Sequence, residues 1–405
     1  YIITTLLITE YSKNADRNSG YGWISLRAFY FRRVKRIIPA AILVIVTTIA
    51  SGYFLFNELK AGWIRRDGIY AAIFMANINL IRQKTDYFSQ SLSQSPLEHY
   101  WSLSVEEQFY LVIPVLILAA VSFHGLAIGK VKLWWERRLF LLLALVSVIS
   151  FAWSLIQTST NPQTAYFSTF TRAWEIGAGG MLAILTLQNQ INFNRKFSNV
   201  ISIAAILIII TSSFLLSGNS KFPGFYALFP VVSTLLIIYF GGSRSGNLLK
   251  SLLSLRSFVF LGEISYSLYL WHLPVFIILG QEIQIIRNSV VQKILLTLIT
   301  LILSLLTYYF VEKPLRNYPI PEKWESANRN TGVPSSRLWL FFTRPKIRNA
   351  LASLLILSLM FSGYRVAATI IYKKPIEPAP ISVDQNNPFL KSNSGTQTES
   401  SDTHT

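Results

Sequence analysis

Apolar runs of about 20 residues recur along this chain and limit its fold more than any other feature. Only helices and closed barrels satisfy their own backbone hydrogen bonds inside a bilayer, and a helix needs about 20 apolar residues to cross it. Only 14% of the 405 residues are charged, against about 25% in soluble domains. The sequence therefore predicts an all-α, polytopic helical membrane protein with about nine full spans. The predicted spans are 37–56, 101–123, 139–156, 169–187, 200–216, 225–240, 257–279, 294–311 and 350–371.

Residues 64–81 form an ambiguous run, because Arg65, Arg66 and Asp67 stand near its start. Lys and Arg accumulate in the loops of the cytoplasmic side of membrane proteins. If 64–81 does not cross the bilayer, most Lys and Arg residues fall in loops on one side, and these loops are 11–36, 124–138, 188–198, 241–256 and 312–348. We therefore expect 64–81 to form an interfacial or re-entrant helix on the outer face.

The net charge of +18 agrees with this topology, in which Lys and Arg hold loops on the cytoplasmic side. A nucleic-acid partner is not expected, because the basic residues are spread among hydrophobic segments and belong to no nucleic-acid motif. The absence of cysteine from the sequence excludes disulfides, thiolate metal sites and cysteine nucleophiles. No metal is expected, since no metal-binding spacing such as H-E-x-x-H occurs.

Residues 96–114, with the sequence PLEHYWSLSVEEQFYLVIP, pass from a polar loop into an apolar helix. Glu106 and Glu107 lie at this transition, where an unpaired carboxylate is costly. Adjacent helical residues lie about 100° apart around the axis, so at least one of the two should point into the protein. If the helix begins near His99, then His99, Ser102 and Glu106 share a face. The stretch is either a helix end among lipid headgroups or a charged wall of an outward-facing cavity.

Two further polar groups occur inside predicted spans. Arg172 and Glu175 are three residues apart, a spacing at which opposite charges usually pair, although Arg172 could equally neutralise Glu106 or Glu107. His272 shares a helical face with Ser265 and Tyr269 in LGEISYSLYLWHLPV. It either makes an interhelical hydrogen bond or serves as a titratable group in a membrane cavity.

A basic cluster of Arg32, Arg33, Lys35 and Arg36 precedes the first complete span. It is either a topology anchor or a site for an anionic cytosolic ligand, because Arg33 and Arg36 share a helical face and could clamp a phosphate. At the inner end of a later span, Glu312 and Arg316 could complete such a site or simply cap the helix.

Five motifs occur in order along the chain: RRVKRIIPA, SLSVEEQFY, TRAWEIGAGG, ISYSLYLWHLPV and VEKPLR. Together they resemble the acyltransferase type 3 family of integral membrane O-acyltransferases, over roughly residues 1–317. The resemblance implies transfer of an acyl group, commonly acetyl from cytosolic acetyl-CoA, to a hydroxyl of an extracytoplasmic glycan or lipid-linked saccharide. It also implies a multi-pass protein of the cell inner (plasma) membrane.

The resemblance suggests roles for the polar residues. Arg33 and Arg36 match the family's R-x-x-R motif, which is suggested to contact the CoA donor, and we expect Arg32 and Arg316 beside them. We expect Glu106, Glu107, Arg172 and Glu175 to shape the acceptor side, and His272 to orient or assist. The predicted topology separates the arginines at the cytoplasmic mouth from the two glutamates nearer the outer mouth.

The domain organisation expected from this resemblance has four parts. They are a membrane acyltransferase domain (1–317), a basic cytoplasmic linker (318–349), an extra transmembrane helix (350–371) and a disordered extracytoplasmic tail (372–405). Residues 1–9 read as the end of a helix whose beginning is missing. The family's catalytic histidine lies in an earlier helix, so the chain as printed is expected to be inactive alone. The SGNH-type esterase domain of some relatives is also expected to be absent, since no Gly-Asp-Ser block occurs.

Two other functions fit the composition. A transporter or flippase for a lipid-linked glycan would use intramembrane charges to couple substrate or protons to movement. A structural partner subunit would need no chemistry at these residues.

Overall fold

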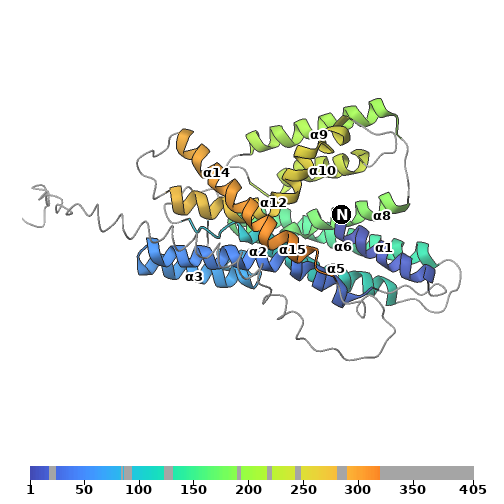
Figure 1. The fold of residues 1–405 in the computed structure, drawn as a ribbon. Helices are drawn as coiled ribbons and strands as arrows, with labels where there is room; N and C mark the ends of the chain where they lie inside the picture. Colours follow the sequence, from blue (N-terminus) through green and yellow to red (C-terminus); the bar gives the residue numbers. More distant parts are fainter. Residues whose placement is uncertain are drawn as a thin grey trace, which may run out of the picture. The chain divides into compact units, whose positions relative to one another are not determined.

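The computed structural model describes residues 1–17, 24–83, 85, 94–122, 131–188, 193–216, 221–241, 248–280 and 290–319. These residues form helices and contain no strand (Figure 1). All of them belong to one compact unit, Tyr1–Ser362. The predicted span 350–371 and the predicted tail 372–405 lie outside the described residues.

Six helical segments of the described residues are long and apolar enough to cross a membrane. They are α2 (Leu26–Leu55), α5 (Tyr100–Ser122), α6 (Val131–Thr160), α9 (Arg195–Leu215), α12 (Arg256–Pro274) with η2 (Val275–Leu279), and α14 (Val290–Thr307) with η4 (Tyr308–Glu312) and α15 (Lys313–Arg316). The prediction of a polytopic helical membrane protein is thereby confirmed. The predicted number of nine spans stays a prediction.

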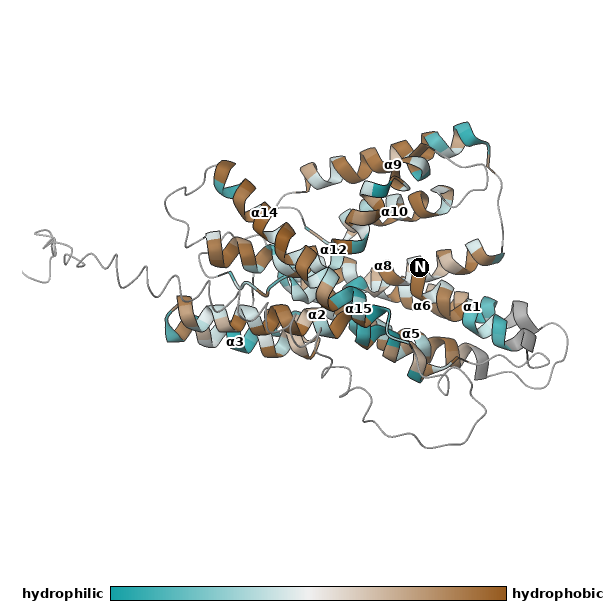
Figure 2. Ribbon diagram, in the orientation of Figure 1, coloured by the Kyte–Doolittle hydropathy of each residue, from teal (hydrophilic) through white to brown (hydrophobic). Residues whose placement is uncertain are grey.

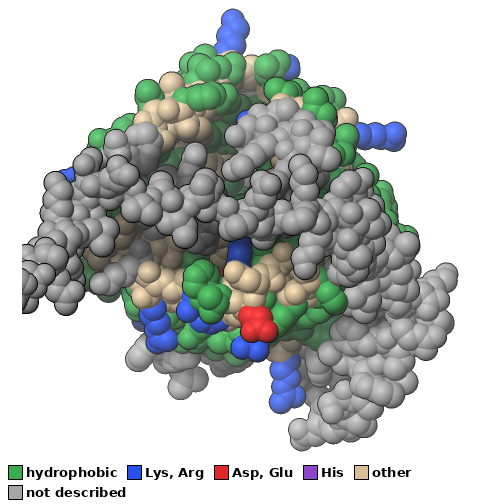
Figure 3. All heavy atoms as spheres, turned by 90° about the vertical axis from the view of Figure 1, so that its left-hand side faces the viewer, with side chains coloured by type: hydrophobic (Ala, Val, Ile, Leu, Met, Phe, Trp, Pro, Cys, Tyr) green, Lys and Arg blue, Asp and Glu red, His purple; other side chains and the backbone are tan. Residues whose placement is uncertain are grey.

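The surface of these helices is apolar, as a lipid-facing surface must be. Exposed side chains include Phe214 of α9, Val148 of α6 and Val290 of α14. Figure 2 shows hydrophobic residues along α9, α14 and α6, and hydrophilic residues gathered around α15. On the face in Figure 3, hydrophobic side chains cover much of the described surface and Lys and Arg side chains project from its edge.

The ambiguous segment forms two helices, α3 (Glu58–Ala72) and α4 (Ala76–Arg82), and not the single helix that we expected. The break lies at Phe74, whose φ of 56° is incompatible with a continuing right-handed helix. Gln108 of α5 donates a hydrogen bond to the Phe74 carbonyl and so stabilises the break. At 1.5 Å per residue the two helices measure about 22 and 10 Å, so neither spans a hydrocarbon core of about 30 Å.

The remaining described helices are α1 (Ile2–Arg17), α7 (Pro162–Phe167), α8 (Thr169–Gln188), η1 (Phe225–Ala227), α10 (Leu228–Gly241) and α11 (Leu248–Leu253). Helices α6 and α8 pack closely, and a Cβ atom on Gly180 would lie only 3.0 Å from Leu143. The glycines of α8 thus permit close helix contact. Helices α9 and α10 lie side by side (Figure 1).

Helix α5 connects two hydrophobic clusters. Tyr100 and Leu103, in its first turn, pack with α2, α12 and η2. Phe109, Ile113 and Ile117, further along, pack with α1, α6 and α8. The first turn of α5 therefore lies beside the helices that carry Arg32, Arg33, Arg36 and His272.

Helix α2 begins at Leu26, where Ser25 caps it, and so includes the whole basic cluster. The predicted span begins only at residue 37, because apolar composition marks the part of a helix inside the membrane and not the helix end. The Tyr100 hydroxyl donates to the Ala41 carbonyl at 3.1 Å, and the Arg33 guanidinium lies 4.8 Å from the Tyr110 ring centre. These two contacts show that α2 and α5 run antiparallel.

Candidate active site

Two histidines from distant parts of the chain meet beside the start of α5. His99, in the turn that precedes α5, is 5% exposed. Its ring centre lies 4.9 Å from that of His272 on α12, 5.0 Å from that of Tyr269 and 4.8 Å from that of Tyr100. We call His99, Ser102, Tyr269 and His272 the histidine cluster.

Tyr269 holds the histidine cluster together. Its hydroxyl donates to the His99 carbonyl and lies 2.9 Å from the Ser102 hydroxyl. Its own carbonyl lies 2.6 Å from Nδ1 of His272. A carbonyl oxygen can only accept, so this bond places a proton on Nδ1 and leaves Nε2 of neutral His272 as a proton acceptor.

The turn before α5, outside the candidate spans, contains two titratable side chains with shifted pKa values. Burial raises the pKa of Glu98 to about 7; the Gln94 side chain opposes this shift and Asp67 adds to it. Burial lowers the pKa of His99 to about 3, and His272 adds to this effect. His99 is therefore a neutral imidazole at physiological pH.

The two predicted glutamates lie on the side of Arg33, and not across from His272. Both are within electrostatic reach of Arg33. Glu106 is exposed and accepts a hydrogen bond from Tyr110 at 3.3 Å, so its carboxylate is directed toward the next turn of α5, away from His99. Glu107 has a buried carboxylate oxygen, which confirms that at least one of the pair points inward.

The expected separation between arginines and glutamates therefore needs correction. Because α2 begins at Leu26 and runs antiparallel to α5, Arg33 stands level with Tyr110, one helical turn from Glu106 and Glu107. The expected separation rests on a predicted helix that begins at residue 37 and leaves the basic cluster outside it. In the structure, α2 begins at Leu26, so the basic cluster lies within the first turns of the helix.

The other arginines divide into two groups. Arg316 lies 3.8 Å from Glu312, which accepts a hydrogen bond from Ser267 at 2.8 Å and is within electrostatic reach of Arg36. Thus α15 and α2 bring Arg36 and Arg316 toward the same carboxylate. Arg32 instead forms an ion pair with Glu10 of α1 at 2.6 Å.

Arg172 and Glu175 form the predicted ion pair, at 3.2 Å. The Arg172 guanidinium also lies 5.0 Å from the Trp101 ring centre and 5.3 Å from that of Phe222. Trp101 and Ser102 point in directions about 100° apart on α5. Arg172 therefore contacts a different face of α5 from the histidine cluster, and the alternative of pairing with Glu106 or Glu107 is not observed.

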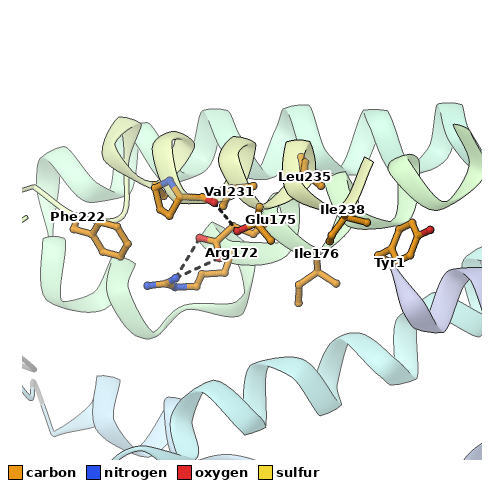
Figure 4. Close-up of a pocket in the computed structure, with 12 residues that line it drawn as sticks. Tyr1, Arg172, Glu175, Ile176, Phe222, Val231, Leu235 and Ile238 are labelled. Carbon is orange, nitrogen blue, oxygen red and sulfur yellow. Dashed lines mark hydrogen bonds and ion pairs between the residues drawn. The ribbon is translucent and has the colours of Figure 1, made fainter. Parts of the chain in front are cut away.

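The Arg172–Glu175 pair lines a pocket of about 410 Å³ between α8 and α10. Figure 4 shows the ion pair near Phe222 at one end of the pocket and Tyr1 at the other, with Ile176, Leu235 and Ile238 between them. Its walls are mostly apolar. Among the described residues, no group of three His, Cys, Asp or Glu side chains is arranged to hold a metal.

The structure thus distributes the predicted catalytic residues over three places. It also brings together Glu98, His99 and Tyr269, of which the sequence pattern places His99 on a face with Ser102, and Tyr269 on a face with His272, but does not mark Glu98. All three lie within the motifs quoted above or directly beside them, so their positions were visible in the sequence. Their mutual contact depends on the packing of α12 against the turn before α5, which no local pattern reveals.

The matches to known proteins all indicate the same family. The family model described as an acyltransferase domain matches residues 1–309. The putative peptidoglycan O-acetyltransferase YrhL of Bacillus subtilis is 29% identical over 84% of this chain and 51% of its own length. The peptidoglycan O-acetyltransferase OatA of Listeria monocytogenes is 28% identical over 78% of this chain and 49% of its own length.

The O-acetyltransferase OatA of Staphylococcus aureus is 30% identical over 78% of this chain and 50% of its own length. The chain therefore spans about half the length of the curated relatives it matches. No solved structure matches it.

Proposed function

Because this chain belongs to the type 3 family of membrane acyltransferases, we propose that it transfers an acetyl group from acetyl-CoA to a hydroxyl of a cell-wall glycan. The names of its relatives, which are peptidoglycan O-acetyltransferases, support the acyl group and the acceptor class. The protein would act in the plasma membrane, with the donor on the cytoplasmic side and residues 372–405 outside.

Arg33, Arg36 and Arg316 are the proposed donor-binding residues. Guanidinium groups bind phosphate through paired hydrogen bonds, and CoA is rich in phosphate. Among the ion pairs of the described residues, none includes Arg33 or Arg36, whereas Arg32 is paired with Glu10. We therefore assign Arg32 a supporting role at the edge of the donor site.

The observation that carries the proposal is the short path from these arginines to the histidine cluster. Tyr100, directly after His99, bonds Ala41, which is five residues beyond Arg36 on α2. Five helical residues advance by about 8 Å. A donor whose phosphates stay at the arginines could thus present its thioester carbon to the histidines.

The remaining predicted residues have supporting roles in this proposal. The negative charges of Glu106 and Glu107 partly offset the positive charge of Arg33 and so limit the affinity for the anionic donor. The Arg172–Glu175 pair fixes Trp101 and with it the first turn of α5, on which the acceptor side depends. His272 orients the acceptor hydroxyl or takes its proton.

The proposal is tested with the protein at its full natural length in proteoliposomes, using acetyl-labelled acetyl-CoA and a peptidoglycan fragment as acceptor. The expected result is label on the glycan as an alkali-labile ester. The double variant Arg33→Ala/Arg36→Ala should raise KM for acetyl-CoA at least tenfold. The exposed double variant Arg137→Ala/Arg195→Ala is the matched control for the loss of two positive charges. Absence of labelled glycan with the unsubstituted protein would refute the proposal.

A further inference from the structure

Buried polar atoms without partners gather at the start of α5. Among the described residues, Glu98 has one such carboxylate oxygen, and both ring nitrogens of His99 lack a hydrogen bond of ordinary geometry. The carbonyls of Pro96 and Leu270 lie near the His99 ring, but neither meets it with the geometry of an ordinary hydrogen bond. Native proteins rarely leave buried polar groups unpaired, and such groups often mark a place that a ligand or water completes.

A purely structural role explains His99 poorly. If the ring only filled space among Tyr100, Tyr269 and His272, phenylalanine would be more stable at this position, because it has no polar atom to desolvate. His99 also stands at a fixed position, because Tyr269 bonds its carbonyl. An imidazole that is held in place and whose N–H group makes no well-formed hydrogen bond is suited to donate one to a substrate.

We infer that His99 donates a hydrogen bond to the carbonyl oxygen of the acyl group during transfer, while Nε2 of the neighbouring His272 accepts the proton of the acceptor hydroxyl. This inference rests on the proposed function and names a further catalytic residue for it. It gives the proton of the acceptor hydroxyl to His272 of this chain, whereas the family resemblance places a catalytic histidine in an earlier helix. Its basis is the contact between the two rings, the lack of a hydrogen bond of ordinary geometry at the His99 ring nitrogens and the bond that holds the proton on Nδ1 of His272.

The reaction balances with an acyl thioester as donor. The acceptor oxygen forms a bond to the acyl carbon as its proton passes to His272 Nε2. Negative charge develops on the acyl oxygen, where the His99 N–H group stabilises it. The C–S bond then breaks, and the leaving thiolate takes the proton from His272. The products are an ester and a free thiol, and both histidines return to their starting state.

The electrostatics of the site agree with these roles. Since burial lowers the pKa of His99 to about 3, the ring stays neutral and donates as an imidazole, without adding a charge beside His272. A neutral histidine is an adequate donor to a developing oxyanion in a desolvated site. The Nδ1 bond of His272 keeps its other nitrogen available as base.

The test compares His99→Phe with His99→Gln in the full-length protein, by kcat and KM for glycan acetylation and by the thermal unfolding midpoint. Phenylalanine retains ring packing and loses the N–H donor, whereas glutamine retains a donor and loses the ring. We expect His99→Phe to lower kcat by about 100-fold, with KM for acetyl-CoA changed less than threefold and the unfolding midpoint unchanged or raised. We expect His99→Gln to keep at least ten times the kcat of His99→Phe.

Activity of His99→Phe within threefold of the unsubstituted protein would overturn the inference, as would a kcat of His99→Gln no higher than that of His99→Phe. If His99→Phe does not fold, His99→Leu takes its place in the comparison. A failure of the unsubstituted protein to acetylate glycan would refute the proposed function as well. Normal acetylation together with an active His99→Phe variant would refute only the role of His99.

Discussion

At the scale of single residues, Glu98 should make stability depend on pH. Its pKa of about 7 in the folded protein exceeds the ordinary value of 4.5, so the folded state binds the proton more tightly than the unfolded state. The stabilisation from its protonated form is complete below pH 4.5 and is lost as pH rises through 7. A glutamine at this position resembles the protonated carboxyl and cannot ionise.

We therefore expect Glu98→Gln to be more stable than the unsubstituted protein at pH 8.5, by at most about 3 kcal/mol, and similar to it at pH 5. The lowered pKa of His99 gives stability the opposite dependence on pH. Because His99 is present in both proteins, its contribution cancels when their free energies of unfolding are compared. Thermal unfolding in detergent at several pH values measures the effect, with the exposed Glu58→Gln as control. A stability difference that does not change with pH would contradict this expectation.

The hydroxyl of Tyr269 should matter more for rate than for stability. Tyr269→Phe removes the bonds to the His99 carbonyl and Ser102 and leaves the carbonyl that holds His272. Loss of one buried hydrogen bond costs about 1–2 kcal/mol, and a displaced His99 should lower kcat by about tenfold or more.

The matched control for Tyr269→Phe is Tyr266→Phe, one turn earlier on α12. Its hydroxyl donates to the Ile37 carbonyl at 2.8 Å, so the variant loses a comparable hydrogen bond away from the histidines. Glycan acetylation and unfolding midpoints are measured for both. Equal losses of kcat in the two variants would show that Tyr269 acts only through stability.

Single residues also show where prediction from sequence ends. The Arg172–Glu175 pair is predictable, because both partners lie on one helix and their spacing alone brings them together. The contact of His99 with Tyr269 and His272 is not, since it joins residues about 170 positions apart. Helical periodicity assigns residues to a face, but it does not say which other helix covers that face.

At the scale of elements, the packing of α3 on α2 depends on a glycine. A Cβ atom on Gly68 would lie 2.6 Å from Ile49 Cδ1 and 3.2 Å from Ile45 Cγ2, so Gly68→Ala must displace either these isoleucine side chains or helix α3 itself. We expect it to destabilise the protein by about 1–3 kcal/mol. A Cβ atom on Gly62, in the same helix, would have no other atom within 4 Å. Gly62→Ala should therefore stabilise by up to about 1 kcal/mol.

Unfolding midpoints of the two alanine variants, measured side by side, test this packing. Because both substitutions raise the helix propensity of α3 equally, the difference between them reports the contact with α2. Similar midpoints for Gly68→Ala and Gly62→Ala would show that the isoleucines move aside without loss of packing.

The sequence predicts the start of α5 well, but not the start of α2 or the break between α3 and α4. Helix α5 begins one residue before the predicted span, since its polar loop ends where the apolar run starts. Helix α2 extends eleven residues further toward the N-terminus than predicted, because its basic turns are helical but not apolar. The break at Phe74 could not be foreseen, since a non-glycine residue with positive φ has no clear sequence signal.

At the scale of the whole molecule, α5 joins the proposed donor and acceptor regions. Its first turn contributes Ser102 to the histidine cluster and a later turn faces Arg33, while both turns belong to a single helix. A fixed distance between phosphate-binding arginines and reacting histidines suits a reaction in which the donor spans both. The class of membrane protein could be predicted from composition, whereas this arrangement required the tertiary contacts of α2, α5 and α12.

The predicted membrane topology can be tested by thiol labelling, because the printed chain has no cysteine and each introduced cysteine is its single thiol. Helix α6 is about 45 Å long, enough for both ends to leave the hydrocarbon core. Arg137 and Ser159 are exposed near its two ends. We expect a membrane-impermeant maleimide to reach Ser159→Cys from outside intact cells, and Arg137→Cys only after the membrane is opened.

The same labelling decides whether α3 and α4 cross the bilayer. Glu58 and Arg82 are exposed at the start of α3 and the end of α4. Since neither helix is long enough to span the core, both Glu58→Cys and Arg82→Cys should label from outside, like Ser159→Cys. Labelling of Glu58→Cys and Arg82→Cys from opposite sides would mean that the pair crosses. In that case the basic start of α2 would face away from the other basic loops, and the proposed cytoplasmic donor site would be wrong.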